Sequence, residues 1–308
     1  MTGGLPLQRD AAVFTLPDGR PFTLLERSTR RALIGLRLWE QGPGHEVGQG
    51  LEVRAHALGP NGAPWPSVAP VRAEINPDGV YVFHRLPMPR AQGDGSPPGP
   101  VGPPLVIEVR DRRGRFLPVA LRTDDPFAQT ELFLVAAPSH QAESPPAADP
   151  RFYLFASPTR TSSPRRYAAV RMQMWHRSSG RPAAHALVEV TRADATWYGL
   201  ADALGRVLVL FPYPPVNASL AGSPPPAEME GLYNQSWELT VRVRYRAQPE
   251  LQPIPGFDLP DLGEIAAQPY AQLLPSEEGV AADSLAGLLH YGRELILTTA
   301  GRSELLLE

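Results

Sequence analysis

The histidines and carboxylates are the side chains of this chain that could do acid–base or metal chemistry. Its 308 residues include 7 histidines and no cysteine, which excludes thiolate metal sites and cysteine nucleophiles. The histidines are spread thinly, and none forms the His-Glu-x-x-His spacing of a zinc enzyme. His45 stands beside Glu46 in a glycine-rich loop, where a metal would be speculation. We therefore expect no metal and no cofactor.

Motifs for nucleophilic catalysis and phosphate binding are also missing. The sequence contains no Gly-x-Ser-x-Gly elbow, and Gly93-Asp94-Gly95 lacks the third glycine and the following helix of a dinucleotide loop. Asp124-Asp125 and the pair Asp258 and Asp261 could in principle act as acid and base. Both pairs lie in Pro-flanked loops, where carboxylates commonly cap turns. The sequence thus predicts a protein that is not an enzyme.

The composition indicates which elements would have to position any site. The chain has 37 prolines and 27 glycines, no collagen-like period, and 43% hydrophobic residues. Short Val- and Leu-rich runs between Pro- and Gly-rich connections are typical of β-sandwiches and barrels. Evidence for helices is thin, and the best candidate is Val280–Leu289, with one or two turns. We predict an all-β protein of antiparallel sheets with long Pro-rich loops.

One stretch of the second half carries a recognisable pattern. The turn Gly180-Arg181-Pro182 leads into the alternating run 186–190, and Ala201-Asp202 with Gly205 precedes the apolar run 207–211. This pattern resembles the carboxypeptidase-regulatory-like, or transthyretin-like, family of seven-stranded Ig-like sandwiches. The resemblance implies a scaffold, because the family motif contains turn and core residues and no catalytic residue.

The two halves of the chain look like copies of each other. The run 76–83 corresponds to 202–211, and each is followed by a Pro-led loop with a Gly-Ser-Pro-Pro element and then by an alternating strand. Trp39 and Trp175 occupy matching places upstream. The first copy has Gly44–Gly50 where the second has the Gly-x-Pro turn. We predict two tandem antiparallel β-sandwich domains.

We place the first domain at residues 1–138, a Pro-rich linker at 139–150 and the second domain at 151–308. The second domain then carries an inserted Pro-rich segment at about 247–285, centred on Ile254–Pro260. A compact domain rarely keeps so long a connection without a role. Two interpretations stay open for it, wrapping over its own sandwich or docking against another subunit.

Charge and aromatic side chains indicate where partners could bind. All 29 basic residues are arginine and the net charge is −3, which argues against a general nucleic-acid binder. Alternation places Arg242, Arg244 and Arg246 on one face of a strand, as a solvated face or a partner-binding stripe. Aromatic rings that could anchor a protein or stack on a sugar complete the candidate contacts, which are Trp65, Tyr198, Arg242, Arg244, Arg246 and Phe257.

These observations favour a non-catalytic structural or assembly protein whose partners are other protein subunits, with self-association left open. The style of the chain, including Gly79–His84 and the closing run 300–305, resembles accessory components of phage-tail-like contractile injection systems. The alternative is a carbohydrate- or cell-surface-binding module. No apolar window is long enough for a membrane span, and residues 1–14 lack the pattern of a secretory signal. We expect a cytoplasmic protein that could leave the cell within a particle.

Overall fold

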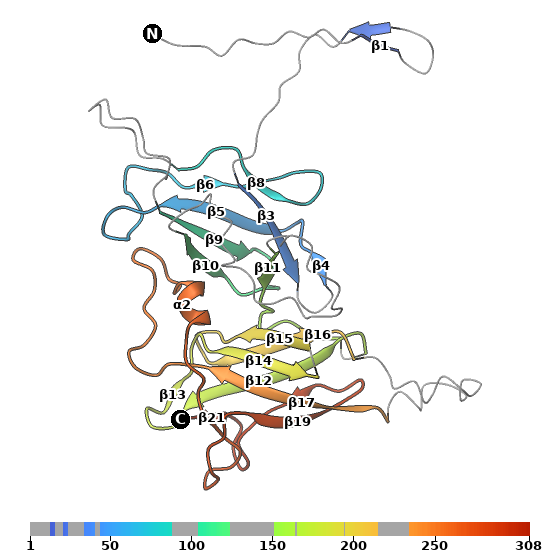
Figure 1. The fold of residues 1–308 in the computed structure, drawn as a ribbon, viewed down its shortest axis with the longest axis vertical. Helices are drawn as coiled ribbons and strands as arrows, with labels where there is room; N and C mark the ends of the chain where they lie inside the picture. Colours follow the sequence, from blue (N-terminus) through green and yellow to red (C-terminus); the bar gives the residue numbers. More distant parts are fainter. Residues whose placement is uncertain are drawn as a thin grey trace, which may run out of the picture.

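A computed structural model describes residues 13–15, 21–23, 34–40, 44–87, 104–123, 151–163, 165–193, 195–214 and 234–308. The regular secondary structure of these residues is almost entirely β-strand, and most of the paired strands are antiparallel (Figure 1). The all-β prediction is therefore confirmed. No helix in these ranges has both the length and the apolar character that a membrane crossing needs. The first two strands, β1 (Val13–Thr15) and β2 (Pro21–Thr23), form a small antiparallel pair on either side of residues 16–20.

The first half, up to residue 154, has two sheets around one core. One sheet runs in the order β10 (Val119–Thr123), β9 (Leu105–Asp111), β5 (Leu51–Ala57), β6 (Val71–Arg72). The other runs β11 (Arg151–Leu154), β3 (Ile34–Glu40), β8 (Tyr81–Phe83), β7 (Glu74–Ile75), with β4 (His45–Glu46) also paired to β3. Buried side chains of both sheets, among them Leu38, Val53 and Phe83, form one hydrophobic cluster.

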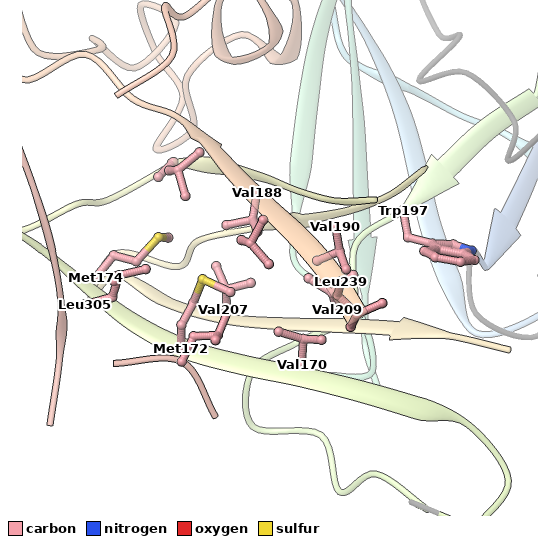
Figure 2. Packing of buried hydrophobic residues seen from close by; sticks show 14 of the residues in the cluster. Val170, Met172, Met174, Val188, Val190, Trp197, Val207, Val209, Leu239 and Leu305 are labelled. Carbon is pink, nitrogen blue, oxygen red and sulfur yellow. The ribbon is translucent and has the colours of Figure 1, made fainter. Parts of the chain in front are cut away.

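The second half, from residue 165, has the same arrangement. Its first sheet runs β13 (Arg181–Pro182), β12 (Ala168–His176), β21 (Leu305–Leu307), β18 (Leu273–Leu274), with β16 (Arg206–Phe211) and β20 (Leu295–Ile296) also on β12. Its second sheet runs β15 (Ala195–Leu200), β14 (Leu187–Arg192), β17 (Ser236–Arg244), β19 (Leu285–His290). Figure 2 shows Val170, Met172 and Val209 from the first sheet and Val188, Val190 and Leu239 from the second within one cluster.

Strand registers match between the halves. Glu52 lies opposite Arg110 in β5–β9, and Glu189 lies opposite Arg242 in β14–β17. In the other sheets, Leu36 faces Tyr81 just as Met172 faces Val207. The alternation of the strands places the equivalent inward positions in both cores.

The turns match as well. The Oδ1 atoms of Asn76 and Asp202 each accept hydrogen bonds from the backbone N–H groups two and four residues later, at 2.9–3.0 Å. Gly79 and Gly205 close these turns with φ of 81° and 71°, the left-handed region that favours glycine. Gly44 has φ of 64° and donates its N–H to the strand before it, as Gly180 does. The first half therefore keeps the turn glycine although its Gly-x-Pro tripeptide is absent.

The strand that we assigned to the start of the second domain belongs to the first half. Strand β11 pairs in parallel with β3, where Phe152 lies opposite Leu38. Its counterpart is β21, which pairs in parallel with β12 and closes the second half. Phe152 and Leu154 are buried in the core of the first half, so burial of these side chains determines the pairing. The proposed linker 139–150 lies outside the described residues.

The helix expected at Val280–Leu289 is wrong. Strand β19 covers the end of that range, and its residues alternate in exposure because Leu285 and Leu289 turn to the core that β17 also covers. A short helix, α2 (Leu262–Ala266), lies instead within the inserted segment. Leu262 and Ile265 of this helix face inward, and no pattern in the sequence predicted the helix.

Candidate partner-binding surface

The inserted segment joins the two halves of the chain. We call residues 247–272 the strap; it leaves the end of β17 and returns to the sheet of β21 and β18 (Figure 1). Ile254 and Leu259 of the strap are buried with Leu58, Val106 and Ala120, which belong to the first half. The strap packs on its own chain, but Ile254 and Leu259 cover the opposite half, whereas the first interpretation expected them to cover their own sandwich.

Phe257 lies at the centre of this contact. Its ring packs edge-on against the imidazole of His56 on β5, with 5.0 Å between ring centroids. The preceding residue, Gly256, has φ of 82°, and a Cβ added there would come within 2.6 Å of Pro64. The strap therefore passes directly against the loop that carries Trp65. Trp65 itself is half-buried, and its backbone N–H donates to the carbonyl of Ala57.

Two aspartates of the strap bind the first half. An oxygen of Asp258 accepts a hydrogen bond from Nη2 of Arg110 at 2.5 Å. Oδ1 of Asp261 accepts one from the backbone N–H of Arg122 at 2.9 Å. These are structural roles for the carboxylates that were considered as an acid–base pair. The other pair, Asp124-Asp125, lies outside the described residues.

Helix α2 packs where the two halves meet, a region that we call the junction. Leu262 and Ile265 are 8% and 3% exposed and belong to the core cluster of the first half, together with Leu187 and Leu200 of the second. Burying one aliphatic side chain contributes about 1.5–3 kcal/mol. The ion pair of Arg110 with Asp258 is mostly exposed and contributes only about 0–1 kcal/mol. Apolar burial is therefore the main force that holds the strap.

The predicted arginine stripe lies under the end of the strap. The guanidinium of Arg242 lies 3.5 Å from the ring centroid of Tyr270, and that of Arg244 lies 4.4 Å from it. Nε of Arg244 donates to Glu189 at 2.7 Å, and its Nη2 donates to the hydroxyl of Tyr270, also at 2.7 Å. The same hydroxyl donates to Glu189 at 2.9 Å, and Glu189 is only 7% exposed. Arg246 is tied through its backbone N–H, which donates to the Gln268 side chain.

Burial and charge shift several pKa values at the junction. Burial lowers the pKa of His56 and that of His185, although nearby Glu108 and Asp202 act in the opposite direction. Burial raises the pKa of Tyr198, helped by the negative charge of Glu189. Burial works against the charge of Arg244, but its bonds to Glu189 and Tyr270 outweigh this and raise its pKa. Burial therefore favours the neutral form of the two histidines, while the bonds of Arg244 favour its charged form.

The six predicted contacts thus have different surroundings. Phe257, Arg242 and Arg244 contact other parts of the same chain, and this could not be seen from their sequence neighbours. Tyr198 is half-buried and packs against the cluster at the junction. Trp65 lies in a loop of the first half, and Tyr198 lies in β15 of the second half. Trp197, beside Tyr198, fills the second core and stacks on Phe211 with 4.3 Å between centroids.

Within the described ranges, no group of three His, Asp or Glu side chains could hold a metal ion. His45 and Glu46 have different surroundings. Glu46 accepts a hydrogen bond from Arg37, whereas His45 is exposed. A groove of about 540 Å³ at the other end of the second half includes Trp175, His176 and Arg302. Arg302 is already paired with Glu277 there.

Comparison of the chain with protein-family models, with curated proteins and with solved structures gave no match in any of the three.

Proposed function

We propose that the protein is a non-catalytic scaffold of two tandem β-sandwich modules, which the strap fixes to each other so that they hold partner subunits at a set spacing. The matching registers of Glu52 with Arg110 and Glu189 with Arg242 support the doubling. The resemblance to the carboxypeptidase-regulatory-like family supports modules of an Ig-like type, whose loops and edges bind neighbours.

The observation that carries this proposal is the strap. Buried Ile254, Leu259, Leu262 and Ile265 attach it to the first half, while Arg244 and Gln268 attach it to the second. A chain that only needed to tether two modules would need no such contacts. Rigid coupling is what a spacer or adaptor requires, because it transmits the position of one bound subunit to the other.

The partners we propose are the other subunits of a large protein assembly, such as a phage-tail-like contractile injection system, in a cytoplasmic setting. The test is gentle lysis of the organism that encodes the chain, followed by density-gradient sedimentation and immunodetection. We expect the protein in fractions that contain large particles. Sedimentation only as a free monomer would contradict the proposal.

A strap variant makes this test sharper. Phe257→Asp places a charge against His56 and should loosen the strap while leaving the two main cores intact. We expect this variant to fold and to be depleted from the particle fractions. The matched control, Leu204→Asp, changes an exposed apolar residue in a turn away from the strap and should sediment like the unchanged protein. Equal sedimentation of both variants would show that fixed module geometry is not needed.

A further inference from the structure

One edge of the first half is built differently from its counterpart. In the second half, β15 stays on β14 from the pair Arg192–Ala195 to the pair Leu187–Leu200. In the first half, β6 pairs with β5 only at Val71 and Arg72. The chain then crosses to the other sheet, where β7 pairs with β8. Strand β7 is the last strand of that sheet among the described residues.

The crossing leaves a groove between the two sheet edges, with a volume of about 1050 Å³. Leu51, Tyr81 and Val82 are among the residues that line it, and they are 5%, 1% and 8% exposed. Ile75 on β7 also lines it and is 44% exposed. An apolar side chain entering here would cover Ile75 and contact the buried residues beneath it.

Within the part of the chain that the structure describes, no strand pairs with the outer side of β7. In an antiparallel ladder, successive residues direct their N–H and C=O groups to opposite sides. The N–H of Asn76 donates toward β8, to the carbonyl of Val80 at 2.9 Å. The N–H and C=O of Ile75 therefore point away from β8, to the outer edge of β7. An edge strand in this state can accept a strand from another chain.

The charge of the groove is mainly positive. Arg72 and Arg85 line it and are exposed, and neither has an ion pair with a described residue. Arg54 faces Arg72 across β5 and β6, but its guanidinium is already paired with Glu52. Glu74 is the one carboxylate lining this groove, and it lies 3.8 Å from Nε2 of His84. Carboxylates on a bound segment would be attracted by both arginines.

We infer that the groove binds an extended segment of a partner protein in which apolar and acidic residues alternate. The segment adds a strand to β7 through the backbone of Ile75. One of its apolar side chains enters beside Ile75, above Leu51 and Tyr81, and its carboxylates lie beside Arg72 and Arg85. This inference deepens the proposed scaffold function, because it names the chemistry of a bound subunit.

The probe for this inference is a phage-displayed library of short random peptides, selected against the full-length protein. Selected sequences are then made as fluorescent peptides and titrated by anisotropy. We expect alternating apolar and acidic residues in them. Affinity should fall by at least about tenfold in Arg72→Glu/Arg85→Glu, because two attractions become repulsions. It should fall similarly in Ile75→Pro, which removes the outward N–H.

The control Arg293→Glu reverses an exposed charge in the second half and should leave affinity unchanged. Circular dichroism checks folding, and the two-arginine variant decides the outcome if Ile75→Pro does not fold. Failure to select any peptide, or equal binding to all variants, would overturn the inference. So would displacement of the peptide by oligothymidylate, which would indicate a polyanion site. None of these readouts depends on particle sedimentation, so the groove and the scaffold function can fail separately.

Discussion

The two halves share strand registers and turn contacts but differ at one edge, where the first half has a shorter segment before the matched turn and a smaller side chain. Trp197 on β15 is 2% exposed in the core of the second half, and it lies opposite Val190. In the first half the residue beside Val53, which matches Val190 in register, is Ala73, and its N–H donates to the Val53 carbonyl. The indole anchors the whole strand to β14, whereas the alanine methyl provides little burial and the chain crosses to the other sheet. The same framework thus yields a closed edge in one half and a groove in the other.

The largest expected effect on stability comes from replacing the tryptophan on which this comparison rests. Trp197→Ala gives the second half the residue found in the first, and removes a buried indole that stacks on Phe211. We expect a loss of about 3–5 kcal/mol in the free energy of unfolding, the usual cost of such truncations. Urea unfolding followed by circular dichroism measures it. The control Ala73→Gly should cost about 1 kcal/mol or less, and a loss below that for Trp197→Ala would refute the anchoring role.

The next comparison uses two equivalent ion pairs. Arg244 binds Glu189, whose side chain is 9% exposed, under the strap. Arg112 binds Glu52 at the matching register, and these two side chains are 61% and 14% exposed, against 31% and 9% for Arg244 and Glu189. Arg244→Ala should therefore cost about 2 kcal/mol of unfolding free energy, as for hydrogen bonds to a buried charge. Arg112→Ala should cost about 0–1 kcal/mol. Equal costs in urea unfolding would mean that the strap does not shield the second pair from water.

The smallest effect concerns pH. His56 and His185 have pKa values below their ordinary 6.5 because they are buried against the strap or the junction. The unfolded chain takes up protons more readily at these sites. Their contribution to stability is therefore complete above pH 6.5 and is lost as pH falls below it. Glu52 has a pKa below its ordinary value of 4.5. Its contribution to stability is therefore lost only as the pH falls below 4.5.

The double variant His56→Gln/His185→Asn should flatten this acid-side loss, as followed by the thermal unfolding midpoint from neutral pH to about pH 5. Asparagine is chosen at position 185 because His185 has φ of 59°, which asparagine tolerates. An unchanged pH slope in the double variant would assign the loss to other groups.

Local patterns made part of this fold predictable. Turn residues such as Asp202 and Gly205 determine the backbone through contacts a few residues away, and the structure has those contacts. The all-β character followed from short apolar runs in the same way. The correspondence of the two halves could be read because equivalent turns and strands recur in order.

Features that depend on distant residues were not predictable. The stripe of Arg242 and Arg244 looked like a solvated or partner-binding face because Tyr270, which covers it, is more than twenty residues away. Strand β11 was assigned to the wrong half because its pairing partner β3 lies far upstream. The groove at β7 depends on where a strand leaves its sheet, and this depends on how residues such as Ala73 pack against distant parts of the core.

The most direct test measures whether the strap fixes the two halves relative to each other. Because the chain has no cysteine, Asp78→Cys and Thr240→Cys introduce one exposed spin-label site in each half. Double electron–electron resonance should give one narrow distance distribution, which broadens when Phe257→Asp and Asp261→Ala loosen the strap. A distribution that is broad from the start, and unchanged by these substitutions, would contradict the rigid scaffold.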